Sequence, residues 1–304
     1  MRYPVALLLA TVLIVGCTGT GSLEGALDAD AKPHGTQAVV AKPEAGVEPE
    51  STTGVASSDA REDGVGGAGA FGVETNSHGG SGLDADTLLA VRHGTHAGYE
   101  RLVLDLGAGD EPAGTVPRWT LVRRKGDRLL RVELPSATAT SVSDGALEDG
   151  LLECFHVVRA PEGGLFVDVL VRSMFRHRVM ELGDPARLVV DFRPLAAPSM
   201  RPAPATGGQT VLLEPRPGTR ISNPLTVSGY SRNFEAANTI TVTDAAGETL
   251  ARKTVTANDW TSTWGYFEAT LDLPPFSGRA TLRVGTYSAR DGAFEGVEVP
   301  VKGG

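Results

Sequence analysis

The sequence feature that most constrains the fold is a series of short apolar runs, each separated from the next by a turn-forming segment. In residues 101–106, leucines alternate with Arg101, Val103 and Asp105, and this period of two gives a strand one apolar face. Apart from a single helical turn that we expect near residues 143–152, no segment shows the helical period of about 3.6 residues. The pattern therefore predicts an all-β protein.

The strand-like runs fall into two groups, separated by residues 195–208, which are rich in proline, alanine and glycine and are expected to form a linker. Residues 87–194 predict about eight antiparallel strands, as in a β-sandwich or open barrel. Residues 209–304 predict about seven, the count of an immunoglobulin-like sandwich. We therefore predict two β-sandwich domains. The expected hairpin arms are residues 88–92 with 101–106, 119–124 with 128–134, 151–159 with 165–172, 175–182 with 187–192, and 239–243 with 250–255.

The N-terminus has the pattern of a signal peptide. Arg2 precedes an apolar run over residues 5–16, which is shorter than the ~18 residues of a membrane-spanning helix. Small Gly16 directly precedes Cys17, and polar residues follow. This arrangement resembles the lipobox of bacterial lipoproteins. The resemblance implies cleavage after residue 16 and acylation of the Cys17 thiol, so the expected partner is membrane lipid. The protein would then be anchored to the cell membrane or outer membrane and face the periplasm or the cell exterior.

Residues 17–86 are expected to form a disordered acidic linker after the lipidated cysteine, because they are rich in glycine, alanine and acidic residues and almost free of aromatic ones. The formal net charge of the chain is −9, and most of the excess acidity lies in this segment. The charge argues against a nucleic-acid partner, because nucleic-acid-binding domains are normally basic. The 2 cysteines exclude a disulfide-rich scaffold and a zinc site of four thiolates.

Two motifs in the first predicted domain point to a family. Residues 96–106 (HAGYERLVLDL) and 184–192 (DPARLVVDF) resemble an AMIN-like domain, and the resemblance covers residues 87–194. AMIN domains are β-sandwich modules of bacterial envelope proteins, and some of them target amidases or secretins to peptidoglycan. The resemblance implies a sandwich at the cell wall and supplies no catalytic residue.

The second predicted domain, residues 209–304, carries five motifs of another family. The motifs PRPG, NPLTVSG, FEA, WGYF and SARDG occur in this order between residues 215 and 292. They resemble the Gmad2 domain, an immunoglobulin-like domain found beside germination-type modules in bacterial envelope proteins. The resemblance implies an adhesion or spacer domain in the envelope and does not imply a role in spores.

The sequence offers no catalytic signature. It lacks G-x-S-x-G, H-E-x-x-H and a phosphate loop, so we expect no enzyme, no catalytic residue and no cofactor. Three aspartates lie in or beside apolar runs, and we expect them to pair with arginines such as Arg101 and Arg187 rather than to act as an acid–base pair. They are Asp105, Asp168 and Asp191.

Metal binding is the chemical alternative. His93 with His96, or Cys154 with His156, could supply ligands to zinc or copper. The histidines near residue 95 are more readily explained as turn residues, and Cys154 lies in an apolar run where we expect it to be buried. We therefore assign no metal site.

Sugar-binding sites present aromatic faces with a few polar groups nearby. We expect Trp264 to be a core anchor of the second sandwich and Trp260 to lie in a loop. The candidate glycan-binding residues are Tyr99, Arg101, Trp119, Trp260, Trp264, Tyr266 and Tyr287.

These observations predict a lipid-anchored cell-envelope binding or scaffold protein that associates with peptidoglycan or a wall polysaccharide. One alternative is a regulator or docking partner of another envelope protein, such as a wall amidase, bound through an exposed strand edge. A metal-binding receptor is the third.

Overall fold

The computed structural model describes residues 69–147, 150–196 and 200–304, and these residues belong to one compact unit. The expected signal peptide, Cys17 and most of the expected linker lie outside them. Strands dominate the described residues, whose helical content is limited to a 3₁₀ turn at Phe234–Ala236. The prediction of an all-β protein is confirmed. None of the described residues forms a helix long and apolar enough to cross a membrane.

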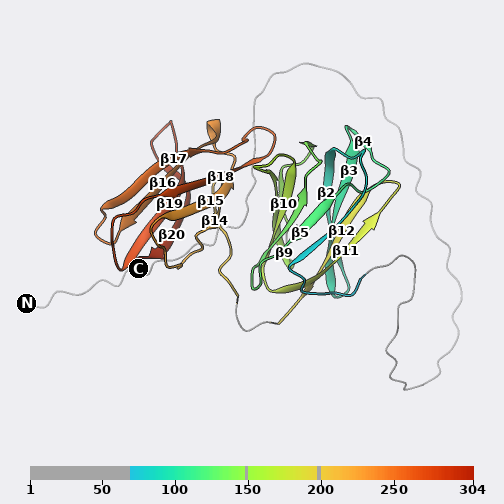
Figure 1. Cartoon of the computed structure of the whole chain (residues 1–304), viewed down its shortest axis with the longest axis horizontal. Coiled ribbons are helices and arrows are strands. Elements are labelled where there is room, and N and C mark those ends of the chain that lie inside the picture. The colour runs from blue at the N-terminus through green and yellow to red at the C-terminus, as the bar shows by residue number, and fades with distance from the viewer. Residues whose placement is uncertain (1–68, 148–149, 197–199) are drawn as a thin grey trace, which may run out of the picture. The chain divides into compact units, whose positions relative to one another are not determined.

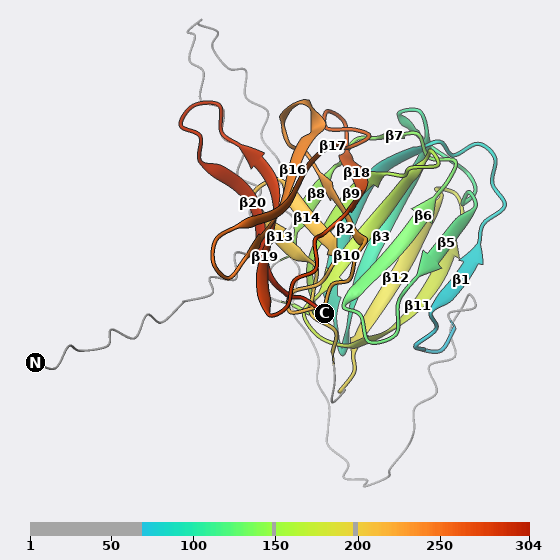
Figure 2. The ribbon, with the colours of Figure 1, turned by 60° about the vertical axis from the view of Figure 1, so that its left-hand side comes forward.

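The first sandwich, coloured cyan to yellow in Figure 1, consists of two facing sheets. The first contains, in spatial order, β1 (Asn76–Gly79), β5 (Trp119–Val122), β6 (Leu129–Leu134), β10 (Leu165–Val171) and β9 (Leu152–Arg159), and β8 (Asp144–Ala146) pairs with β9. The second contains β11 (Phe175–Leu182), β12 (Arg187–Pro194), β3 (Tyr99–Ala108), β2 (Thr87–His96) and β7 (Ala139–Thr140), and β4 (Glu111–Pro112) pairs with β3. Figure 2 shows β6, β5 and β1 side by side at the edge of the first sheet.

The period-two pattern explains the core of this sandwich. Leu102, Leu104 and Leu106 of β3 are buried, as are Leu130 and the other alternate apolar residues of β6. All four expected hairpins form, because the β2–β3, β5–β6, β9–β10 and β11–β12 pairs are antiparallel. The β2–β3 turn needs Gly98, whose φ of +82° lies in the left-handed region that glycine adopts without strain.

The second sandwich, coloured orange to red in Figure 1, also has two sheets. One contains β18 (Trp264–Leu271), β15 (Leu225–Ser231), β14 (Thr210–Glu214) and β13 (Ala205–Gly207), and the other contains β17 (Thr249–Thr256), β16 (Ala237–Asp244), β19 (Arg279–Tyr287) and β20 (Phe294–Lys302). Val227 and Phe267 of the first sheet and Ile240 and Leu282 of the second are all buried in one core. The expected hairpin of β16 and β17 forms as predicted.

One sheet of each sandwich joins the other to make a continuous ten-stranded sheet. The junction is a short parallel pairing of β9 with β18, in which Val158 lies opposite Trp264 and Arg159 opposite Gly265. A cluster containing Phe166, Tyr230 and Trp264 fills the space at this junction. As a result β10 is buried on both faces, which explains why its sequence is an almost unbroken apolar run.

Three expectations about local structure are wrong. The helical turn expected near residues 143–152 is replaced, in its described part, by strand β8, which pairs with β9. Strand β1 lies inside the expected acidic linker, and β13 lies inside the expected linker over residues 195–208. These short strands lack apolar alternation and depend on backbone hydrogen bonds to β5 and β14, which no local pattern reveals.

Candidate functional site

The outer face of the sheet that contains β11, β12 and β3 carries a buried carboxylate under two arginines. The register places Asp191 of β12 between Arg178 of β11 and Arg101 of β3. Arg101 donates two hydrogen bonds to Asp191, at 2.7 and 3.0 Å, and Arg178 Nε donates a third at 2.8 Å. Burial raises the pKa of Asp191, but the hydrogen bonds from both arginines outweigh burial and leave this pKa below 3.8. The carboxylate is therefore ionised at neutral pH.

Aromatic rings lie among these arginines. The guanidinium carbons of Arg178 and Arg193 are 4.6 and 4.3 Å from the centroid of the Phe71 ring. Those of Arg101 and Arg178 are 5.5 and 5.4 Å from the centroid of Tyr99. These are cation–π distances, so the arginine side chains are held over the rings rather than freely mobile.

Two further cations on this face lack a counter-charge. Arg176 of β11 lies directly opposite Arg193 of β12 in the antiparallel register, and both side chains are exposed. Among the described residues neither forms an ion pair, since only Arg178 and Arg101 on this face reach Asp191. Like charges directly opposite each other destabilise a sheet. We call this surface the arginine–aromatic face, comprising Phe71, Tyr99, Arg101, Arg176, Arg178, Asp191 and Arg193.

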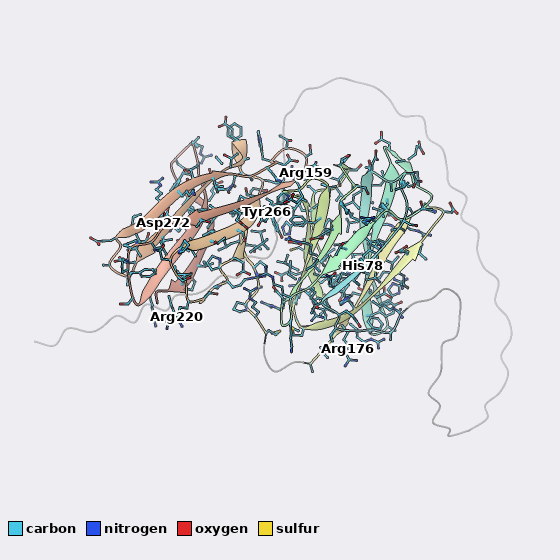
Figure 3. All side chains as sticks on the ribbon, in the orientation of Figure 1. His78, Arg159, Arg176, Arg220, Tyr266 and Asp272 are labelled. Carbon is cyan, nitrogen blue, oxygen red and sulfur yellow. The ribbon has the colours of Figure 1, made fainter. Side chains whose placement is uncertain are left out.

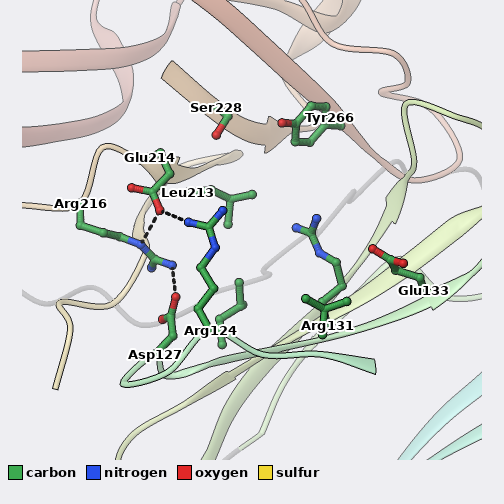
Figure 4. Close-up of a pocket in the computed structure, with 11 residues that line it drawn as sticks. Arg124, Asp127, Arg131, Glu133, Leu213, Glu214, Arg216, Ser228 and Tyr266 are labelled. Atoms are coloured by element: carbon green, nitrogen blue, oxygen red, sulfur yellow. Dashed lines mark hydrogen bonds and ion pairs between the residues drawn. The ribbon is translucent and has the colours of Figure 1, made fainter. Parts of the chain in front are cut away.

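A second polar site is a pocket of about 160 Å³ between the two sandwiches (Figure 4). Tyr266 lines one end beside Arg131 and Glu133, and its hydroxyl donates a hydrogen bond of 2.9 Å to Glu268. The Arg131 guanidinium donates two hydrogen bonds, of 2.7 and 2.8 Å, to the carboxylate of buried Asp168. The Tyr266 ring and hydroxyl and the charged groups of Arg131 and Glu133 all line this end, which is the composition expected of a site for a polar ligand.

The other end of this pocket is filled by ion pairs that join the two sandwiches. Arg216 donates to Asp127 at 2.8 Å, and Arg124 donates to Glu214 at 2.9 Å. Arg201 also donates to Glu214, at 2.7 Å. These ion pairs cross the junction, although Nε and Nη1 of Arg216 have no hydrogen-bond partner among the described residues. We interpret this end of the pocket as a structural contact between the two sandwiches.

Two of the expected glycan-binding tryptophans are buried. Trp119 and Trp264 are each 5% exposed and belong to hydrophobic clusters. Their indole nitrogens donate to Glu181, at 2.8 Å, and to Asp144, at 3.2 Å. Both side chains are almost fully buried, so the structure gives both residues packing roles, as expected for Trp264 but not for Trp119.

The remaining candidates lie apart on the second sandwich. Trp260 is half-buried in the loop between β17 and β18, where its ring centroid is 5.2 Å from that of Phe234. Tyr287 is 42% exposed at the end of β19 and packs against Phe294. Figure 3 shows Tyr266 on the second sandwich, whereas Arg176 lies at one end of the first. Of the seven predicted residues, the structure brings only Tyr99 and Arg101 together in one surface.

The sequence reasoning missed most of the arginine–aromatic face. Phe71 lies in the glycine-rich segment that we expected to be linker, so nothing marked it as part of a sheet face. A usable signal was present at residues 175–179 (FRHRV), where arginines alternate with residues that are buried or half-buried. Only the pairing register, however, places Arg193 beside Arg176.

The expectation that the strand aspartates pair with arginines is confirmed for all three aspartates, although one of the two arginines named is not a partner. Asp168 pairs with Arg131 and Asp191 with Arg101, as expected for acidic residues on apolar strands. Asp105 pairs with Arg92. Arg187 is not a partner, because its Nε donates to the carbonyl of Pro185 at 3.2 Å.

The residues considered as metal ligands have other contacts. His93 Nε2 lies 3.0 Å from Glu100 Oε2. The His96 ring stacks on the Tyr99 ring, and the two ring centroids are 4.7 Å apart. Cys154 and His156 are buried in β9, as expected for Cys154. Within the described ranges, no group of three or more His, Cys, Asp or Glu side chains is placed to hold a metal ion.

The fold is thus a pair of β-sandwiches joined by a shared sheet. Residues 210–293, from β14 to the turn before β20, match the Gmad2 family, described as the immunoglobulin-like domain of bacterial spore germination. This agrees with the motifs seen in the sequence. No curated protein and no solved structure matches the chain.

Proposed function

We propose that this protein is a lipid-anchored binding or scaffold protein of the bacterial cell envelope, and that its arginine–aromatic face binds peptidoglycan or another acidic wall polysaccharide. The observation that carries the proposal is the opposed pair Arg176 and Arg193, which has no carboxylate partner in the described chain. A ligand that brings negative charge would relieve the repulsion between them.

The chemistry of such a polymer fits the rest of the face. The rings of Phe71 and Tyr99 offer apolar surface to sugar rings, and arginine forks match carboxylate oxygens. Peptidoglycan carries carboxylates on its peptide stems. An open sheet face can also follow a long polymer, whereas the pocket beside Tyr266 has room for about one sugar ring.

The location rests on sequence resemblance. The lipobox-like arrangement around Cys17 supports a lipid anchor, and the AMIN-like motifs in residues 87–194 support attachment to the wall. The Gmad2 match supports an envelope spacer role for the second sandwich. Because the shared sheet joins both sandwiches, the spacer and the binding face would act as one unit.

Docking to another envelope protein, such as a wall amidase, is the alternative. Strand β17 is the edge of its sheet and pairs only with β16 among the described strands. However, its exposed side chains include Arg252 and Lys253, and charged residues on an edge discourage strand addition. We therefore place polysaccharide binding first.

Co-sedimentation with purified peptidoglycan, at low and moderate salt, tests the proposal. We expect a soluble form that begins at Thr18 to pellet with the wall. The double variant Arg176→Gln/Arg193→Gln should bind about tenfold more weakly, since it removes the uncompensated charges. The matched control Arg279→Gln/Arg290→Gln, which neutralises two exposed arginines of the second sandwich, should bind as the parent does. Equal binding by both double variants would refute the assignment of this face.

A further inference from the structure

A cavity of about 200 Å³ lies at one open edge of the first sandwich, between β1 of one sheet and β11 of the other. Ser77, Trp119 and His177 line it, with Glu74 on the same wall. His177 and Arg178 are neighbours on β11 and therefore point to opposite sides of the strand. Arg178 of the arginine–aromatic face also lines the cavity, so the cavity lies at the edge of β11 and extends from its inner side, where His177 points, to that face.

Of the seven buried side-chain atoms in the described residues that have no hydrogen-bond partner, four lie at this edge, and the others belong to Arg128 and Arg216. Ser77 Oγ, His177 Nδ1 and both Nε and Nη1 of Arg123 are buried and have no hydrogen-bond partner among the described residues. His177 and Arg123 are only 3% and 4% exposed. Buried polar side-chain atoms nearly always have partners, so each exception calls for an explanation, such as a bound water, ion or ligand.

Arg123 lies immediately behind this group. Its backbone nitrogen donates to the Thr75 carbonyl at 2.9 Å, next to β1, and its guanidinium carbon is 4.0 Å from the centroid of the Phe175 ring. It forms no ion pair with any described residue. Burial, followed by the charge of Arg123, lowers the pKa of His177 to about 4. The charge of Glu74, which also lines the cavity, opposes this shift. The edge therefore holds a buried arginine without an ion pair, one acidic side chain and a histidine that is neutral at pH 7.

These groups define the chemistry of a ligand. The Ser77 hydroxyl donates, the neutral His177 ring can carry its proton on Nδ1, and Arg123 supplies positive charge. The cavity exceeds the roughly 30 Å³ of a single water, and the Trp119 ring gives it an apolar wall. A carboxylate attached to a small organic group can accept hydrogen bonds from Ser77 and His177, and its charge can be compensated by Arg123, which lies behind the cavity wall and does not line it.

We infer that this cavity binds a small carboxylate, either a free organic acid or the acid group of a sugar, with its oxygens on Ser77 and His177 and with its charge compensated by Arg123. This inference goes beyond the proposed function, because it concerns a ligand held by Ser77 and His177 rather than by the exposed Arg176 and Arg193. It explains why a buried arginine and a buried neutral histidine are placed together at an open sheet edge.

The test is nuclear magnetic resonance of the histidine rings at pH 7, with the soluble chain titrated separately with sodium lactate and sodium glucuronate. Sodium chloride at matched ionic strength serves as the blank. We expect saturable shifts of the His177 ring signals with one acid or both. A response to lactate alone indicates a free organic acid, and a response to glucuronate indicates the acid group of a sugar.

Ser77→Ala should weaken the response at least severalfold, since it removes one donor from the cavity. Ser81→Ala, which changes an exposed serine just beyond β1, is the matched control and should titrate as the parent does. If neither acid gives a saturable shift in the folded protein, or if Ser77→Ala titrates as the parent does, the cavity holds water only and the inference is overturned. Because Ser77 is only partly buried, its variant is expected to fold.

Discussion

Arg216 of the second sandwich donates a hydrogen bond of 2.8 Å to Asp127 of the first, and both side chains are 2% exposed. Burial lowers the pKa of Arg216, while the nearby charge of Asp127 opposes this effect. The pair is thus a buried ionic contact that depends on both partners. The pair lies beside the shared sheet and links the two sandwiches through residues that are 89 positions apart in the sequence.

Removal of one partner from this pair should destabilise the protein strongly. Asp127→Ala removes the hydrogen-bonded partner of buried Arg216 and leaves it only Glu214, whose Oε1 is 3.8 Å from Nε. We expect a loss of about 3 kcal/mol in the free energy of unfolding. Urea denaturation measures this change. Glu298→Gln breaks a pair with Arg283 in which both side chains are nearly half exposed, and it should cost less than about 1 kcal/mol. Similar losses for the two variants would contradict a structural role for the buried pair.

Stability should fall on acidification because of His156. This side chain is 3% exposed at the junction, and burial lowers its pKa from 6.5 to about 4, although the charge of Asp144 opposes the shift. The unfolded chain therefore binds a proton near pH 6.5, whereas the folded chain does so only near pH 4. Stability that is present above pH 6.5 is lost as the pH falls towards 4, by up to about 3 kcal/mol.

Urea midpoints at several pH values between 7.5 and 4.5 check this prediction. His156→Gln should flatten the dependence, and His177 should contribute in the same direction, because its pKa is also lowered to about 4. His78→Gln is the control, since His78 is exposed on β1 (Figure 3) and should leave the slope unchanged. An unchanged slope in His156→Gln would show that this histidine titrates normally in the folded protein.

Replacement of Trp119 should lower the free energy of unfolding much more than replacement of Trp260. Trp119→Ala opens a cavity in the core and removes the hydrogen bond to Glu181, so we expect a loss of about 3 to 5 kcal/mol. Trp260 is half-buried in a loop, and Trp260→Ala should cost about 1 kcal/mol. Thermal unfolding gives the comparison. If Trp119→Ala abolished wall binding without loss of stability, the ring would be a contact residue and its assignment to the core would be wrong.

Lipidation of Cys17 should be visible by mass spectrometry. In a bacterial host, we expect the mature chain to begin at Cys17 with a diacylglyceryl group on sulfur and to fractionate with membranes. Cys17→Ala should block processing and keep the signal peptide attached. A proteolytic fragment in which Cys17 is joined to Cys154 by a disulfide would contradict the proposed anchor.

Local alternation predicted the hairpins because each arm shows its buried face in its own residues, as in residues 101–106. Strands β1 and β13 carry no such pattern. They form because their backbone groups pair with those of the neighbouring strands β5 and β14. The candidate site depends on register in the same way. Tyr99 and Arg101 are two residues apart and could be paired from the sequence, whereas Arg176 and Arg193 meet only after the chain turns between β11 and β12.

The buried carboxylate of Asp191 also fixes how the arginine–aromatic face responds to its surroundings. Hydrogen bonding to Asp191 raises the pKa of Arg101, just as contact with the arginines lowers that of Asp191. Asp191 and Arg101 therefore both keep their charges between mild acid and mild alkali. If the face binds an anionic polymer as proposed, ionic strength rather than pH would therefore control the affinity.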